Sequence, residues 1–152
     1  MLKRSVVLLG LIALVACGGG SPSSPTPAPT PVPTPTPPVS YAGTFGSDTL
    51  TYTDETGVYL ASATLKIVES GNTLVFGSLA LTTPFVANYP LGSAPHTNGR
   101  FEGNGGYDSR GCGRATTHFE GYFSADGRIL NLTMKFTFTG CGDTDIRGEL
   151  RR

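Results

Sequence analysis

Histidine is the side chain that most often acts as a general base, and the 152-residue chain contains only two, His96 and His118. A Ser-His-Asp site needs three groups that converge in space, and neither histidine is accompanied by a GxSxG or SxxK motif. His118 alternates with polar residues along a predicted strand, so we interpret it as an exposed strand residue. We therefore assign no catalytic residue and expect a protein that is not an enzyme.

Two glycine- and proline-containing segments carry the residue types that anchor binding interfaces. Residues 82–100 are long for a connection in a small domain, and residues 102–113 form a second predicted loop. Long loops often carry binding residues, and tyrosine and arginine are enriched at interfaces. The alternative is that both segments are only irregular connections. The candidate binding residues are Phe85, Tyr89, His96, Tyr107, Asp108 and Arg110.

Closely spaced carboxylates occur at Asp54 and Glu55 and again at Asp143 and Asp145. Both pairs lie in turn-like surroundings, where aspartate is favoured because its side chain accepts hydrogen bonds from the nearby backbone. No calcium loop of the EF-hand pattern is present. We therefore expect no metal site and no cofactor.

Strands are the elements that would position these residues, because apolar residues recur at every second position and no long stretch has helical periodicity. Asp126-Gly127 is a strong signal for a two-residue hairpin. The apolar faces of the two flanking segments coincide when this turn sets the pairing. In that register Phe123 faces Leu130, Gly121 faces Leu132, Phe119 faces Met134, Thr117 faces Phe136 and Ala115 faces Phe138.

The same register places Cys112 opposite Cys141. Directly opposed Cα atoms of antiparallel strands lie within reach of a disulfide. A metal pair or a redox pair fits less well, because the two cysteines do not form a CxxC motif. We predict a Cys112–Cys141 disulfide, which would stabilise the fold by about 3–4 kcal/mol in the chain-entropy model.

The remaining strands are predicted from shorter patterns. Residues 43–53 would form a first strand or two with a bulge at Gly46, Phe101 would lie in a short strand, and residues 145–152 would form a closing strand. The expected fold is all-β, a meander of seven or eight antiparallel strands closing into a small barrel, with a two-sheet sandwich as the alternative. A hairpin around Gly71-Asn72 would pair Ile67 with Phe76, Leu65 with Ser78 and Ala63 with Ala80.

The N-terminus combines a short positive start with an apolar run over residues 6–16. A membrane span needs about 20 apolar residues, so this run has the length of a secretory signal instead. The run ends in Leu14-Val15-Ala16-Cys17, which resembles the lipobox of bacterial lipoproteins. The resemblance implies cleavage before Cys17 and attachment of diacylglycerol to its sulfur. An ordinary signal peptide with a chance cysteine is the alternative.

The lipoprotein resemblance also implies a location in the cell envelope, with the membrane as a partner through the lipid on Cys17. Gly18 follows the cysteine where an aspartate would signal retention in the inner membrane, so the resemblance favours the outer membrane. Two or three acyl chains anchor a protein stably, whereas a single chain binds only marginally. The predicted organisation is a signal peptide (1–16), a lipidated spacer (17–40) and a β domain (41–152).

Residues 18–40 contain no charged or aromatic residue, and proline recurs at about every second position. Each proline fixes φ and removes a hydrogen-bond donor, so the segment favours polyproline II. Twenty such residues would span about 60 Å as a semi-rigid spacer. The alternative is a PxxP ligand for a partner domain, but no flanking Lys or Arg supports it.

The composition of the mature chain gives no sign of a nucleic-acid partner. Removal of Lys3 and Arg4 with the signal peptide leaves nine Lys and Arg (11 − 2) against 11 Asp and Glu, a formal charge of −2. A nucleic-acid-binding domain normally carries a basic patch or stripe. The partner that we expect is therefore an unidentified protein or small-molecule ligand.

The start of the first strand, Gly43-Thr44-Phe45-Gly46, resembles the Gly-x-Trp start of lipocalin- and avidin-like barrels, the calycins, with Phe in place of Trp. The resemblance implies an up-and-down barrel and no particular ligand. We expect a non-enzymatic cell-envelope lipoprotein whose β domain binds a partner or small ligand. One alternative is a periplasmic inhibitor of lysozyme or another hydrolase, since small lipoprotein barrels with a disulfide resemble such inhibitors. A hydrolase on a β scaffold is the other alternative.

Overall fold

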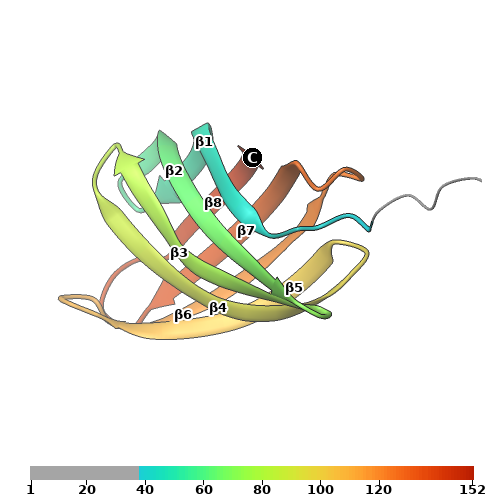
Figure 1. The fold of residues 1–152 in the computed structure, drawn as a ribbon. Coiled ribbons are helices and arrows are strands. Elements are labelled where there is room, and N and C mark those ends of the chain that lie inside the picture. Colours follow the sequence, from blue (N-terminus) through green and yellow to red (C-terminus); the bar gives the residue numbers. More distant parts are fainter. Residues whose placement is uncertain (1–37) are drawn as a thin grey trace, which may run out of the picture. The chain divides into compact units, whose positions relative to one another are not determined.

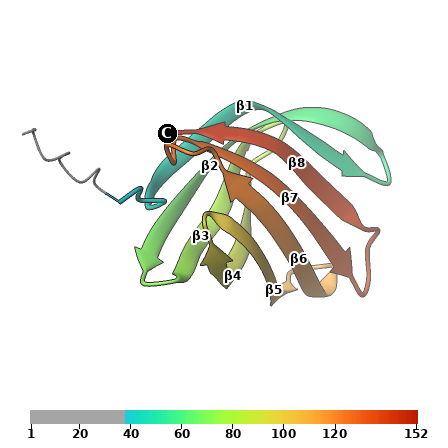
Figure 2. The same cartoon turned by 90° about the vertical axis from the view of Figure 1, so that its right-hand side faces the viewer.

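The computed structural model describes residues 38–152 as eight antiparallel strands that follow one another around a closed barrel (Figures 1 and 2). This confirms the expected all-β meander and is compatible with a calycin-like barrel, whereas the two-sheet alternative is wrong. The predicted signal peptide, Cys17 and most of the spacer lie outside the described residues. The strands are β1 (Gly43–Asp54), β2 (Gly57–Ser70), β3 (Thr73–Thr83), β4 (Ala87–Thr97), β5 (Arg100–Ser109), β6 (Gly113–Phe123), β7 (Ile129–Phe138) and β8 (Thr144–Arg151).

The barrel interior is a packed hydrophobic core. Alternate residues of each strand point inward, as expected for a sheet with one buried face. Burial of each large apolar side chain contributes about 1.5–3 kcal/mol, so this core is the main source of stability. The largest fully buried side chains are Phe45, Phe119, Phe136, Leu50, Leu65, Ile67, Leu74, Leu79, Leu81, Leu130, Met134 and Ile146.

The β6–β7 hairpin has the predicted register along its whole length, from Phe123 paired with Leu130 to Ala115 paired with Phe138. Beyond the last strand residues, the backbone N–H of Gly140 donates to the carbonyl oxygen of Cys112 at 2.9 Å. The predicted Cys112–Cys141 disulfide is present, with 5.1 Å between the two Cα atoms.

The β2–β3 hairpin keeps the predicted pairing of Ile67 with Phe76 but shifts farther along the strands. Ala63 pairs with Leu81, so its predicted pairing with Ala80 is wrong by one residue. The cause is an extra residue in β3, which makes a bulge in the ladder. Leu65, whose predicted partner was Ser78, lies in the irregular stretch that this bulge creates.

The first predicted segment forms one strand, β1, rather than two, and its bulge does not lie at Gly46 as predicted. Gly46 pairs in register with Thr64 on one side and with Arg151 on the other. The register shifts between Ser47 and Leu50 instead. The bulge therefore follows Gly46 by two residues, which returns Leu50 to the core.

The two predicted binding loops are mostly strand. Residues 87–97 form β4 and residues 100–109 form β5, so the expected loops at 82–100 and 102–113 are wrong in secondary structure. The ladder between β4 and β5 contains only two pairs, His96 with Phe101 and Thr97 with Arg100. Proline is tolerated in a strand that leaves an edge unpaired, which explains how β4 accommodates its two prolines.

The glycines of β5 suggested a loop in the sequence, but in the structure they have a packing role. A Cβ atom at Gly103 would lie 2.5 Å from Cζ of Phe119, and one at Gly105 would collide with the carbonyl oxygen of Leu91. The missing side chains therefore let β5 cross close to β4 and let the Phe119 ring enter the core. The strand around Phe101 is accordingly longer than predicted.

The barrel has two different ends. One, the spacer end, contains residues 38–42, the turns at 71–72, 98–99 and 124–128, and Arg152, whose guanidinium donates to the carbonyl oxygen of Ala42. Figure 2 shows the C-terminus beside the start of β1. The other, the disulfide end, contains the four remaining turns and the disulfide. Among residues 38–152 there is no helix long and apolar enough to cross a membrane.

Candidate functional site

A pocket of about 450 Å³ opens at the disulfide end, and we call it the mouth pocket. It lies where β4 and β5 have left their short ladder, because residues 87–89 and 107–109 both line it. The end of β1 and the segments that carry the disulfide complete its wall. The side chains that matter most below are Tyr52, Asp54, Tyr89, Tyr107, Asp108 and Arg110.

Aromatic rings form one part of the mouth pocket. Tyr89 is only 7% exposed, with its ring centroid 4.6 Å from that of Phe136 and its hydroxyl 3.5 Å from the hydroxyl of Tyr52. Phe85 packs edge-on against Tyr52, and Tyr107 lies perpendicular to Phe138. Burial raises the pKa of both Tyr89 and Tyr107 above the ordinary value of 10.0, because the charged phenolate is poorly solvated there.

Carboxylates form the other part. Oδ1 of Asp54 accepts hydrogen bonds from the Thr56 backbone N–H at 2.8 Å, from the Thr56 hydroxyl at 2.5 Å and from the Gly57 N–H at 3.1 Å. The Thr56 hydroxyl, which stabilises the charged form, is the main reason that the pKa of Asp54 is below its ordinary value of 3.8. Asp54 is therefore ionised at neutral pH and is fixed in place by its own turn.

Five of the six candidate residues predicted from the sequence gather at this end. Tyr89, Tyr107, Asp108 and Arg110 line the mouth pocket, and Phe85 contacts it through Tyr52. Tyr89 and Tyr107 arrive there as inward-facing strand residues rather than as loop residues.

His96 is the predicted residue that lies elsewhere. It sits at the spacer end with a side chain only 8% exposed, its Nε2 3.5 Å from Oε1 of Glu69. The ring of Tyr41 packs edge-on against it at 5.3 Å. Glu69 also accepts a hydrogen bond from the Tyr41 backbone N–H at 2.9 Å. His96 therefore helps to attach the segment that precedes β1 and contributes nothing to the mouth pocket.

The mouth pocket also contains residues that were not among the candidate binding residues of the sequence interpretation, chiefly Tyr52, Asp54 and Phe138. Their signal was available, since Tyr52 continues the inward alternation that begins at Leu50 and Phe138 continues that of β7. A tyrosine at an inward position near a strand end places its hydroxyl at the rim of a core, where it needs a polar partner.

The other candidates for chemistry do not assemble into a site. His118 is exposed, as expected, and it pairs with Lys135 across the ladder, with Nδ1 3.1 Å from Oδ1 of Asn104. Asp143 makes an ion pair with Lys135 at 3.1 Å. Within the described part of the chain, residues 38–152, no group of three or more His, Cys, Asp and Glu side chains is arranged to hold a metal ion.

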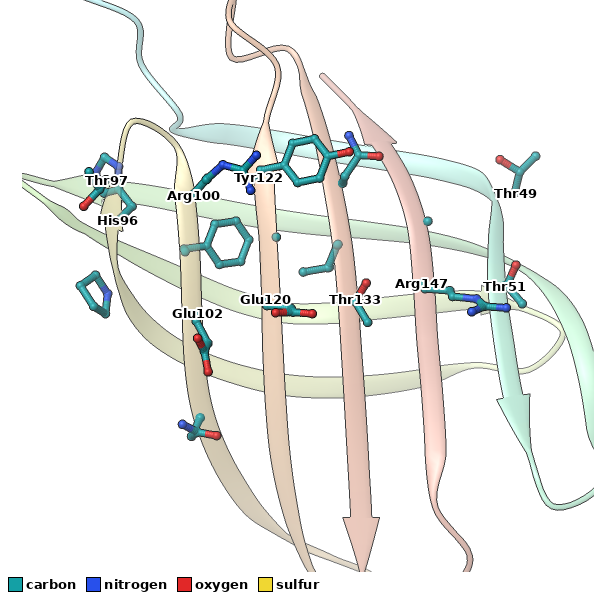
Figure 3. A pocket seen from close by; sticks show the side chains of 17 residues that line it. Thr49, Thr51, His96, Thr97, Arg100, Glu102, Glu120, Tyr122, Thr133 and Arg147 are labelled. Carbon is teal, nitrogen blue, oxygen red and sulfur yellow. The ribbon is translucent and has the colours of Figure 1, made fainter.

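A second and larger hollow, of about 1080 Å³, lies on the outer face of the barrel, and we call it the outer groove. Figure 3 shows outward-facing side chains that cross β5, β6, β7, β8 and β1 in one row. This row consists of Glu102, Glu120, Thr133, Arg147 and Thr51.

Little holds the side chains of the outer groove in place. The guanidinium of Arg100 lies 5.3 Å from the ring centroid of Tyr122, which is 46% exposed. Glu102 stands directly opposite Glu120, an unfavourable pairing of like charges. Arg147 forms no ion pair with the residues that the structure describes. Apart from His96, which Glu69 and Tyr41 hold at its edge, the polar side chains of the outer groove make few contacts, and we take the mouth pocket as the candidate functional site.

Comparisons of the chain with protein-family models, with curated proteins and with solved structures gave no match.

Proposed function

We propose that the protein is a non-enzymatic, lipid-anchored protein of the cell envelope whose barrel binds a small ligand in the mouth pocket. The observation that carries this proposal is the convergence of buried tyrosines and acidic side chains at one open end of an otherwise packed barrel. Ligand sites are typically concave, mostly apolar and supplied with a few fixed polar groups, and they occur in the mouths of β-barrels.

The chain enters the barrel at the end opposite the mouth pocket, which supports a role in which the pocket is accessible to ligands. Residues 38–42 join β1 at the spacer end, and the mouth pocket lies at the disulfide end. The Tyr41 ring packs on Phe123 at 4.8 Å, so the incoming segment is fixed to the barrel. A spacer that leads to a lipid on Cys17 would therefore join the barrel at the end opposite the mouth pocket.

The arrangement of titratable groups supports binding rather than hydrolysis. A general base must lie within hydrogen-bond reach of the proton that it removes. His96 lies at the opposite end of the barrel and His118 on its outer face. Asp54, the best-fixed carboxylate of the mouth pocket, has its pKa lowered, which makes it a weaker base.

Ligand capture from envelope extract tests the proposal. The full-length chain in nonionic detergent would be incubated with the small-molecule fraction, and the retained compounds identified by mass spectrometry. We expect compounds that are enriched on the wild type and on Tyr122→Ala but lost on Tyr107→Ala. Of the two substituted tyrosines, only Tyr107 lines the mouth pocket. Identical retention by all three chains would contradict the proposal.

The lipid anchor is tested separately by mass spectrometry of the mature N-terminus. We expect a chain that begins at Cys17 with acyl groups attached, and a Cys17→Ser chain that is released from membranes. An intact Met1 on a freely soluble product would show that the anchor is absent, and it would leave the mouth pocket untouched.

A further inference from the structure

We infer that the mouth pocket selects small organic cations, such as alkylammonium or quaternary ammonium compounds. This inference rests on the proposed function, because it names the ligand class of the same pocket. Two independent properties of the pocket lead to it, namely the chemistry of its walls and the balance of charge around it.

The walls are aromatic. The rings of Tyr52, Tyr89, Tyr107 and Phe138 line the pocket together. The face of an aromatic ring attracts a cation through its quadrupole, and the attraction grows when water is excluded. Tyrosine is neutral at physiological pH because its ordinary pKa is about 10, and burial raises the pKa of Tyr89 and Tyr107 further, so these walls carry no charge.

The charge around the pocket is predominantly negative. Three carboxylates, Asp54, Glu55 and Asp108, line it against a single basic group, Arg110. The turn that follows β1 occupies only Oδ1 of Asp54, which leaves Oδ2 outside that set of hydrogen bonds. The outer groove differs, because Glu102 and Glu120 are balanced there by Arg100 and Arg147.

The size of the pocket limits the ligand. A volume of about 450 Å³ is at the low end of the range for ligand sites, which runs from about 300 to about 1,000 Å³. Cys112 and Cys141 both line the pocket, so their covalent bond fixes part of its wall. A compact ammonium compound therefore fits better than a large planar or polyanionic molecule.

The test compares choline with its neutral isostere 3,3-dimethyl-1-butanol, in which carbon replaces the charged nitrogen. Both would be titrated into the full-length chain in nonionic detergent while the tyrosine ring resonances are followed by NMR. We expect choline to perturb Tyr52, Tyr89 and Tyr107 and to bind about tenfold more tightly than the isostere, since only the cation gains from aromatic faces and carboxylates.

Matched variants locate the effect. Asp108→Asn should weaken choline binding about tenfold and Arg110→Gln should strengthen it about threefold, because the first removes an attractive charge and the second a repulsive one. Glu120→Gln, a carboxylate of the outer groove, is the control and should leave the affinity unchanged.

Three results would overturn the inference without overturning the proposed function. Equal binding of choline and its isostere would show a pocket without preference for charge. Absence of choline binding, together with Tyr107-dependent capture of another compound from extract, would show a ligand of a different class. Choline binding that is equally weakened by Asp108→Asn and Glu120→Gln would place the cation outside the mouth pocket and would also reject the inference.

Discussion

The mouth pocket and the outer groove are both hollows of one barrel, yet they are built from opposite faces of its strands. The outer groove is the larger, but its side chains point to solvent and few contacts hold them. The mouth pocket is smaller, and its tyrosines and Asp54 are held by burial and by a turn. Ordering loose side chains opposes binding. We therefore compare the two hollows by their fixed groups rather than by their volume.

The strongest way to sharpen this comparison is to remove the disulfide. The double variant Cys112→Ala/Cys141→Ala should lose about 3–4 kcal/mol of stability in urea denaturation, because the unfolded chain regains loop entropy. Native-state hydrogen exchange should accelerate most at residues 110–112 and 139–142, which lie by the mouth pocket. An equal loss of protection at Glu102 and Glu120 in the outer groove would show that the disulfide does not act on the mouth selectively.

Two tyrosines offer a matched comparison of the regions. Tyr89→Ala should cost about 3 kcal/mol, because it leaves a cavity beside Phe136. Tyr122→Ala should cost less than about 1 kcal/mol, because its ring is about half exposed and lies beside the guanidinium of Arg100. Chemical denaturation followed by circular dichroism measures both. Similar losses for the two variants would contradict the distinction between a buried wall and an exposed face.

In the outer groove, one substitution should stabilise the fold. Glu102→Gln removes a like charge that stands directly opposite Glu120 and should add about 0.2–1 kcal/mol. The gain should shrink in high salt, since both side chains are exposed and are screened there. A loss of stability instead would mean that the contact of Glu102 with His118 at 3.9 Å outweighs the repulsion.

The smallest expected effect concerns pH. The Thr56 hydroxyl lowers the pKa of Asp54 in the folded chain, so the folded state binds fewer protons than the unfolded state near the ordinary value of 3.8. The resulting stability is present above that value and is lost as the pH falls through the folded pKa. Asp54→Asn should therefore make stability fall less steeply between about pH 5 and about pH 2. An unchanged acid-denaturation slope would contradict this role.

The parts of the fold that the sequence predicted correctly depend on local rules. Asp126-Gly127 sets both the turn and the register, and the apolar alternation of β7 agrees with it, so the pairing of β6 with β7 and the disulfide follow. The β2–β3 pairing is correct at Ile67 and fails beyond the bulge, although Gly77 lies in the bulged stretch and glycine inside a strand often marks a bulge.

The errors arise where one residue type serves two purposes. Pro90 and Pro95 resemble loop residues, but the edge of β4 that faces β5 is mostly unpaired and tolerates them. Gly103 also resembles a loop residue, whereas its missing side chain makes room for Phe119. Both features depend on contacts between strands that the order of residues along the chain does not reveal. Tyr89, Tyr107 and Asp108 therefore lie in strands, whereas the sequence interpretation assigned them to loops.

The short ladder between β4 and β5 has a consequence for the connectivity of the barrel. Arg152 contacts Ala42, so the two termini of the described chain meet, and the turn at 98–99 joins the two strands that share the fewest rungs. A circular permutant that links those termini and begins at Gly99 would keep the seven fuller ladders intact. Such a chain would have its new termini between β4 and β5, the two strands that separate to form the mouth pocket.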